Sequence, residues 1–277
     1  MHPPQGRHPL ISFRVYLLLL FTMCMVSCTN KSAEIKEAIS TVDQGTTSPM
    51  LPLIHDPVEF LDSIFSAAML DAQNPEPSEI YNNLTRIEGN SNLIDTLIAG
   101  ERYVLMVSWK NNPTYIPESG KYETDDSHDI WVTESPFIQQ KCIQYYKSEK
   151  DPNMRLRQLL GLQPFTVETA FVEFWVKPEE LYRPCPDNET SDTACELNLP
   201  QDVDQEYRTW FNHTRAFQYS DCKDTVFNEL GYPWTQLGYT YDWSPDNPSH
   251  VGLSEFVIRR NSIIYVRGKY NTKSYCM

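Results

Sequence analysis

Apolar residues recur at spacings of three and four along several stretches of the chain, which is the period of a helix with one buried face. Three of these stretches begin with a capping residue followed by proline, at Asp56-Pro57, Ser135-Pro136 and Asp151-Pro152. Proline is favoured in the first helical turn, where its missing N–H has no partner to lose. The pattern predicts helices over residues 56–72, about 135–146, about 151–160 and about 205–219.

Other stretches are short, rich in β-branched and aromatic residues, and bounded by turn residues, which is typical of strands. They cover residues 102–109, 130–133, 170–176, 237–243, 251–258 and 263–267. Helices and strands interleave without the regular spacing of parallel β-α-β units, and the C-terminal strands follow one another closely. We therefore expect a single disulfide-bearing α+β domain over residues 56–277, with a mainly antiparallel sheet and several helices on one side.

The N-terminal segment has the layout of a signal peptide. Arg7 and Arg14 precede an apolar run over residues 15–26, which ends at Ser27-Cys28. A run of about a dozen residues is too short for a membrane-spanning helix, which needs roughly 20. Residues 1–27 are therefore expected to be a cleaved signal.

Met25-Val26-Ser27-Cys28 resembles the lipobox of bacterial lipoproteins, although leucine is commoner where Met25 stands. The resemblance covers the first tenth of the chain and implies that Cys28 is acylated and becomes the new N-terminus. The resemblance further implies sorting to the outer rather than the inner membrane, because Thr29 stands where an aspartate would favour inner-membrane retention. A plain secretory signal cut nearby, or an uncleaved anchor, is the alternative. Residues 28–55 would then be the lipidated cysteine and a flexible spacer, which attaches the domain to the membrane.

Composition narrows the range of partners. The chain has 277 residues and a formal net charge of −14, so electrostatic binding to nucleic acid or to an anionic bilayer surface is disfavoured. Motifs for nucleoside triphosphates, dinucleotides, zinc peptidases and α/β-hydrolases do not occur in the sequence. We expect no cofactor.

The cysteines fit an exported protein. Cys185 and Cys195 bracket a polar loop and are the pair expected to form a disulfide. Cys142, Cys222 and Cys276 cannot be assigned from the sequence, and one of them is left over: a buried thiol or a dimer link is favoured over a nucleophile. Because no Cys/His metal spacing occurs, and because a solvated acidic loop explains the surroundings of His128, no metal site is predicted.

Two glutamates stand out by their positions in predicted strands. Glu173 alternates with Phe171 and Trp175, and Glu255 alternates with Leu253 and Val257, so each carboxylate shares a strand face with apolar side chains. Burial would raise the pKa of either group and suit it to acid or base catalysis. The favoured alternative is that these two faces are solvated and that the opposite faces form the core.

The segment from Trp234 to Trp243 is unusually aromatic. Tyr239, Tyr241 and Trp243 fall on one predicted strand face, with Trp234 just before them. Such a face could stack on sugar rings or nucleobases. The favoured alternative is that these residues form the core of a hairpin.

Ser254-Glu255, followed by a strand, a tight turn at Arg260-Asn261 and another strand, resembles the last catalytic segment of bacterial ADP-ribosyltransferase toxins. The resemblance implies a catalytic glutamate ahead of a hairpin. It covers under a tenth of the chain, and the arginine and the Ser-Thr-Ser strand of that family have no counterpart in this sequence.

Two hypotheses of function follow from these residues. The leading one is a lipid-anchored envelope or surface protein that binds a ligand or partner, a glycan or a protein, through its Tyr/Trp-rich C-terminal region. The alternative is a glycan-acting hydrolase or glycosyl-transferring enzyme, with Glu173 and Glu255 as its paired carboxylates. The two differ in one distance, because paired carboxylates should lie about 5 to 10 Å apart.

Overall fold

The computed structural model describes residues 57–126, 128–219 and 231–277. The predicted signal peptide, Cys28, the spacer and Cys222 lie outside the described residues.

The described chain is an α+β domain, as the sequence predicts. Its helices are α2 (Pro57–Ala72), α3 (Ser135–Ser148), α4 (Pro152–Leu159), α5 (Gln205–Gln218) and α6 (Thr272–Tyr275). Its strands are β1 (Asp95–Ile98), β2 (Glu101–Lys110), β3 (Gly120–Glu123), β4 (Ile130–Glu134), β5 (Ala170–Val176), β6 (Leu181–Tyr182), β7 (Tyr239–Tyr241), β8 (Val251–Ser254), β9 (Phe256–Ile258) and β10 (Ile263–Asn271).

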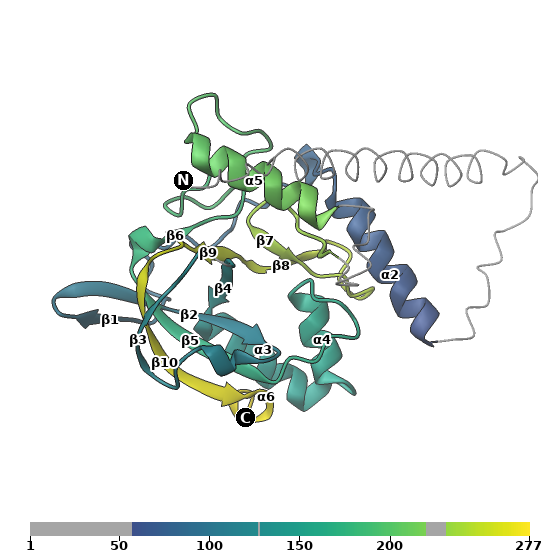
Figure 1. The fold of residues 1–277 in the computed structure, drawn as a ribbon. Coiled ribbons are helices and arrows are strands. Elements are labelled where there is room, and N and C mark those ends of the chain that lie inside the picture. The colour runs from purple at the N-terminus through teal and green to yellow at the C-terminus, as the bar shows by residue number, and fades with distance from the viewer. Residues whose placement is uncertain (1–56, 127, 220–230) are drawn as a thin grey trace, which may run out of the picture. The chain divides into compact units, whose positions relative to one another are not determined.

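Eight strands form one antiparallel sheet in the order β3-β10-β5-β2-β4-β9-β6, with β1 added beside β2 (Figure 1). The central pairing joins β2 to β5 along the whole of β5, with Val104 opposite Val176 and Lys110 opposite Ala170. A separate two-stranded sheet consists of β7 and β8.

The sheet is curved, and the link between β9 and β10 explains why. Only residues 259–262 separate these strands, yet β9 pairs with β4 and β6 whereas β10 pairs with β3 and β5. In a flat sheet they would lie four strand spacings apart, about 19 Å. That is more than the roughly 17 Å that so short a link can span, so the sheet must curl. The two strands that follow Glu255 are therefore not paired as a hairpin.

One side of the sheet, which we call the helical face, carries Val107 of β2, Glu173 of β5 and Val257 of β9. Paired residues of neighbouring strands point to the same face, and Glu173, Val107 and Thr133 are in register across β5, β2 and β4. Helices α3, α4 and α6 pack on this face around Val107 and Phe171. Helix α5 packs on it around Val257 and Tyr182, so four helices cover one side as predicted.

The opposite side, which we call the loop-covered face, is lined by buried apolar residues from most of the large sheet. Met106 and Phe174 lie near its centre. Ile87, Leu93 and Ile116, which come from the connecting loops, cover it. Both faces of the sheet are therefore buried, and the prediction that one face is solvated is wrong.

Helix α2 packs against the small sheet. Phe65 contacts the Trp243 ring edge-on at 5.8 Å between ring centroids, and Tyr241 joins the same cluster. Strand β8 passes so close to β7 and α4 that a Cβ at Gly252 would collide with Thr240 and with the Leu159 carbonyl. This close packing sets the position of β8 relative to the helical layer.

Two disulfides are present among the described residues. Cys185 and Cys195 are bonded, with their Cα atoms 6.2 Å apart, as the loop between them predicts. Cys142 and Cys276 form the second disulfide, with Cα atoms 5.0 Å apart. This second bond ties α3 to the C-terminal end of the chain, a link across 134 residues that sequence spacing could not indicate.

Candidate functional site

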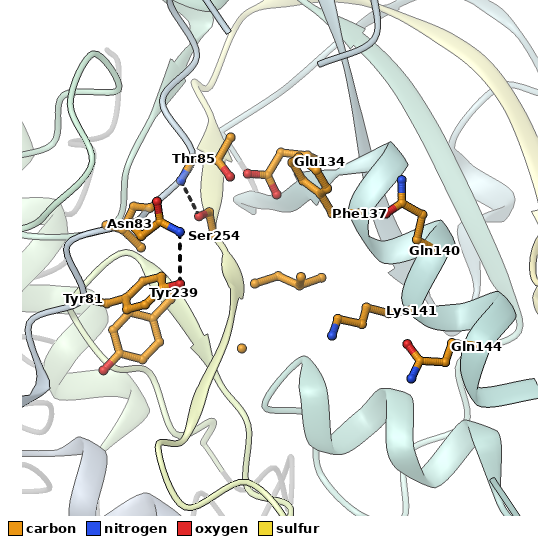
Figure 2. Close-up of a pocket in the computed structure, with 13 residues that line it drawn as sticks. Tyr81, Asn83, Thr85, Glu134, Phe137, Gln140, Lys141, Gln144, Tyr239 and Ser254 are labelled. Atoms are coloured by element: carbon orange, nitrogen blue, oxygen red, sulfur yellow. Dashed lines mark hydrogen bonds between the residues drawn. The ribbon is translucent and has the colours of Figure 1, made fainter. Parts of the chain in front are cut away.

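A cavity of about 430 Å³ lies between α3 and β8 (Figure 2). One wall is α3, which contributes Phe137, Gln140, Lys141 and Gln144. The other walls come from residues 81–85 and from the two-stranded sheet, which contributes Tyr239, Gly252, Leu253 and Ser254, and Glu134 lies at the end of β4 between them.

Helical periodicity places the α3 residues on one wall. Phe137, Lys141 and Gln144 follow one another at spacings of four and three, so they form one stripe along the helix. The opposite stripe of α3, with Ile138 and Cys142, is buried against the sheet. The polar stripe consequently faces the cavity.

Residues 81–85 are held against β8 and the disulfide loop by backbone hydrogen bonds. The Thr85 N–H donates to Ser254 Oγ at 2.8 Å, and the Leu84 N–H donates to the Thr193 carbonyl at 2.8 Å. The Cys185–Cys195 loop thereby helps to position the wall that carries Tyr81 and Asn83.

Glu134 is the most unusual residue of the lining. Its side chain is completely buried, and its Oε2 accepts a hydrogen bond of 2.8 Å from Thr133 Oγ1. Its Oε1 makes no hydrogen bond with the described residues. Burial raises the pKa of Glu134, and the hydroxyls of Thr85 and Thr133 together with the charge of Arg183 oppose that rise only in part.

Arg183 is the buried cation that acts on Glu134. It is fully buried and held by Asp192 at 2.9 Å and by the Thr85 carbonyl at 3.0 Å. Its Nε and Glu134 Oε1 are the two buried side-chain polar atoms in the described part of the chain that have no hydrogen-bond partner. Such atoms are rare in native proteins and call for an explanation.

Glu173, one of the predicted catalytic residues, does not line the cavity. It is buried on the helical face, where Ser135 Oγ donates to its Oε1 and Arg267 Nη1 donates to its Oε2 at 2.8 Å. The Tyr275 hydroxyl lies 3.3 Å from Oε1. Both oxygens of Glu173 therefore have protein partners.

Glu255, the other predicted catalytic residue, follows the lining residue Ser254 in the link between β8 and β9, but it does not itself line the cavity. It is half-buried, and burial raises its pKa to about 8. The strand order places β9, which begins just after Glu255, three strand spacings from the strand of Glu173, or about 14 Å measured along the curved sheet. The spacing expected of a glycosidase pair is therefore not supported by the topology.

The four aromatic residues predicted to bind a ligand do not form one platform. All are buried, and they belong to three separate clusters. Trp234 packs with Phe211 of α5, whereas Tyr241 and Trp243 pack with α2. Tyr239 alone among the four lines the cavity. The arrangement corresponds to the alternative in which these aromatic residues are core.

Metal-ligand spacing occurs once among the described residues, at Cys185, Asp187 and Cys195. The two sulfur atoms are bonded to each other, so neither is a thiolate that could bind a cation. In the described part of the chain no helix is long and apolar enough to cross a membrane.

Comparisons with known proteins identify no relative. No protein-family model matches the sequence, and no curated protein or solved structure shows significant similarity to it. The chemistry of the cavity therefore has to be inferred from its own residues.

Sequence reasoning missed Glu134 and the α3 stripe. The sequence around Glu134, Thr133-Glu134-Ser135-Pro136, is typical of the end of a strand followed by a helix cap. Nothing in this pattern indicates that Glu134 is buried. The one available signal was the polar stripe of Gln140, Lys141 and Gln144 beside the apolar one. That pattern is also typical of a solvated helix face.

Proposed function

We propose that this chain is a lipid-anchored protein of the bacterial envelope, attached to the outer membrane, whose α+β domain binds a small polar ligand in the cavity between α3 and β8. The observation that carries the proposal is Glu134, a buried carboxyl with an unpartnered oxygen at the edge of this cavity. The cavity volume of about 430 Å³ falls within the range typical of small-molecule sites.

A buried acceptor without a partner costs about 1–3 kcal/mol of folding free energy. A side chain that serves packing alone would be replaced by an apolar one at no such cost. A ligand group that donates a hydrogen bond to Glu134 Oε1 would recover that free energy on binding. The cost is therefore most simply explained if the carboxyl is kept for a ligand.

Catalysis by two carboxylates receives less support than binding. Glu134 is the one carboxylate among the described residues that line the cavity. Glu173 is held by protein partners, and neither Glu173 nor Glu255 lines the cavity. Glycoside hydrolysis usually needs an acid and a second carboxylate on the two sides of the bond that breaks. Binding is accordingly the function we favour.

The anchoring part of the proposal rests on the order of a basic segment, an apolar run and Ser27-Cys28. Cells expressing the chain are labelled with a palmitate analogue. We expect labelled protein in the detergent phase for the natural chain and for Cys24→Ala, whose cysteine lies inside the predicted signal. Cys28→Ala should abolish the label. Equal labelling of both variants would contradict the assignment of Cys28.

The binding part is tested by ligand-observed NMR with a library of small polar fragments and the detergent-solubilised full chain. Gln144→Trp places a large ring in the cavity, whereas Lys147→Trp places the same ring on an exposed position of the same helix, outside the lining. We expect fragments to bind the natural chain and Lys147→Trp, and to lose binding in Gln144→Trp. The same fragments binding all three proteins would contradict the proposed site.

A further inference from the structure

The lining carries little charge. Lys141 is its one basic residue and Glu134 its one acidic residue among those described, and burial raises the pKa of Glu134, which favours its neutral form. A site for a multivalent cation or for a polyanion would be expected to carry several charges of one sign. The lining therefore favours a ligand without net charge.

The remaining polar groups of the lining are mostly amides. Asn83 extends from one wall, and Gln140 and Gln144 extend from α3 on the other (Figure 2). The two glutamine side chains are exposed, and Asn83 has only a long contact of 3.4 Å to the Tyr81 hydroxyl. An amide offers both donors and an acceptor, which matches hydroxyl groups that also do both.

Apolar surface lies between these amides. Leu253 and Phe137 contribute to the lining, and the rings of Tyr81 and Tyr239 meet edge-on at 6.2 Å between centroids. The Tyr239 hydroxyl is already used, because it donates to the Glu79 carbonyl at 2.9 Å. The half-buried Tyr81, Phe137 and Leu253 therefore offer carbon surface to a ligand, which suits the C–H faces of a sugar ring, whereas Tyr239 is buried beneath Tyr81.

We infer that the ligand of this cavity is an uncharged saccharide, bound with its hydroxyls on Asn83, Gln140, Gln144 and Glu134 and with a ring face on the apolar part of the lining. The inference rests on the proposed function and adds the ligand class to it. No bond is broken in this process, so the domain would recognise a glycan without cleaving it.

The test uses the detergent-solubilised full chain and four probes: maltotriose, cellotriose, chitotriose and the peptide trialanine. Saturation-transfer NMR and calorimetric titration measure binding. We expect at least one of the three saccharides to bind and trialanine not to bind. Gln140→Ala and Gln144→Ala should each weaken saccharide binding about 3- to 10-fold, as expected for the loss of one hydrogen bond. Lys147→Ala, an exposed change on the same helix, should leave it unchanged.

The outcomes separate this inference from the proposed function. If trialanine binds and no saccharide does, the saccharide inference fails. The proposed function would still be supported in that case if small polar fragments bind the natural chain and lose binding in Gln144→Trp. If a saccharide binds equally well to Gln140→Ala, Gln144→Ala and the natural chain, its site is elsewhere and the inference is again overturned. If neither saccharides nor fragments bind, both proposals fail together.

Discussion

Two buried glutamates lie almost side by side on opposite faces of the sheet, and their surroundings differ sharply. Glu173 is opposite Val107 in the pairing of β5 with β2, and Glu134 is opposite the preceding residue, Met106, in the pairing of β4 with β2. Their exposed fractions are 2% and 0%. Burial therefore does not distinguish these two residues.

Their partners do. Glu173 is held by a hydroxyl at the start of α3, a hydroxyl in α6 and a guanidinium on β10. It thus joins three elements that are distant in sequence. Glu134 Oε2 accepts a hydrogen bond from the Thr133 hydroxyl, and the Thr85 hydroxyl also favours the charged form of this carboxyl, but Oε1 has no hydrogen-bond partner among the described residues. The comparison teaches that burial in an apolar face does not by itself mark a carboxylate as functional, because the protein can satisfy all of its hydrogen-bonding capacity, as it does for Glu173.

The largest effect is expected from removing the disulfide beside Glu173. Cys142→Ala with Cys276→Ala frees the C-terminal segment that carries Tyr275. In the loop-entropy account, a link across 134 residues stabilises the fold by about 5 kcal/mol, whereas one across 10 residues contributes about 3 kcal/mol. Urea unfolding under non-reducing conditions compares this double variant with Cys185→Ala plus Cys195→Ala. A larger loss from the short loop would contradict the account.

The next effect tests the ion pair itself. Arg267→Met leaves the buried Glu173 charge without its cation, and we expect a loss of about 2–3 kcal/mol in urea unfolding. Arg102→Met is the matched control, because Arg102 pairs with Asp95 at the surface, where such pairs contribute under about 1 kcal/mol. Adding Glu173→Gln to Arg267→Met should recover part of the loss. Equal losses for the two arginine variants would show that Glu173 does not depend on its partner.

Glu134 should respond in the opposite direction. Burial raises its folded-state pKa, so the folded state holds its proton more tightly than the unfolded chain does. The contribution of this group to stability is therefore complete below the ordinary glutamate pKa and is lost as pH rises above it. We expect Glu134→Gln to raise Tm at pH 8, where the unfolded chain releases this proton, with little change at pH 4.

Glu173→Gln is the control for this change. At pH 8 it should lower Tm, because it removes the charge that Arg267 pairs with. A fall in Tm for Glu134→Gln at the same pH would mean that its charge is stabilised by groups such as Arg183, and the argument from an unused oxygen would lose its basis.

Much of the fold could be predicted from sequence because its elements are locally encoded. Pro57, Pro136 and Pro152 mark the starts of three helices, and β5 has the bounds that its apolar run indicates. The pairing partners of the strands could not be predicted. The turn at Arg260-Asn261 has the pattern of a hairpin, which predicts that β10 pairs with β9, but β10 pairs with β5 and β3.

The candidate site was harder to predict for the same reason. Glu173 was selected by its alternation with apolar residues, which predicts burial but not the presence of Arg267, 94 residues further on. Glu134 was overlooked because its polar neighbours suggest a solvated turn, whereas residues 81–85 and β8 pack around it in the folded chain. Whether a buried polar side chain finds hydrogen-bond partners depends on the tertiary structure, which the local sequence does not specify.

Substitution of Glu255 is expected to have the smallest effect on stability. Glu255 is half-buried, so the effect shows whether it resembles the paired Glu173 or the unpartnered Glu134. Arg259, Arg260 and Arg267 are engaged elsewhere, with the Glu179 carbonyl, Asp129 and Glu173 respectively. Burial raises the pKa of Glu255 from 4.5 to about 8, so stability should decline as pH rises through that interval.

Because water screens a half-buried group, we expect Glu255→Gln to stabilise the fold by only about 1 kcal/mol at pH 8 and to flatten the dependence of Tm on pH. Glu88→Gln, at an exposed position, should leave both quantities unchanged. If Glu255→Gln instead lowers Tm by several degrees, Glu255 has a stabilising partner and belongs with Glu173 rather than with Glu134.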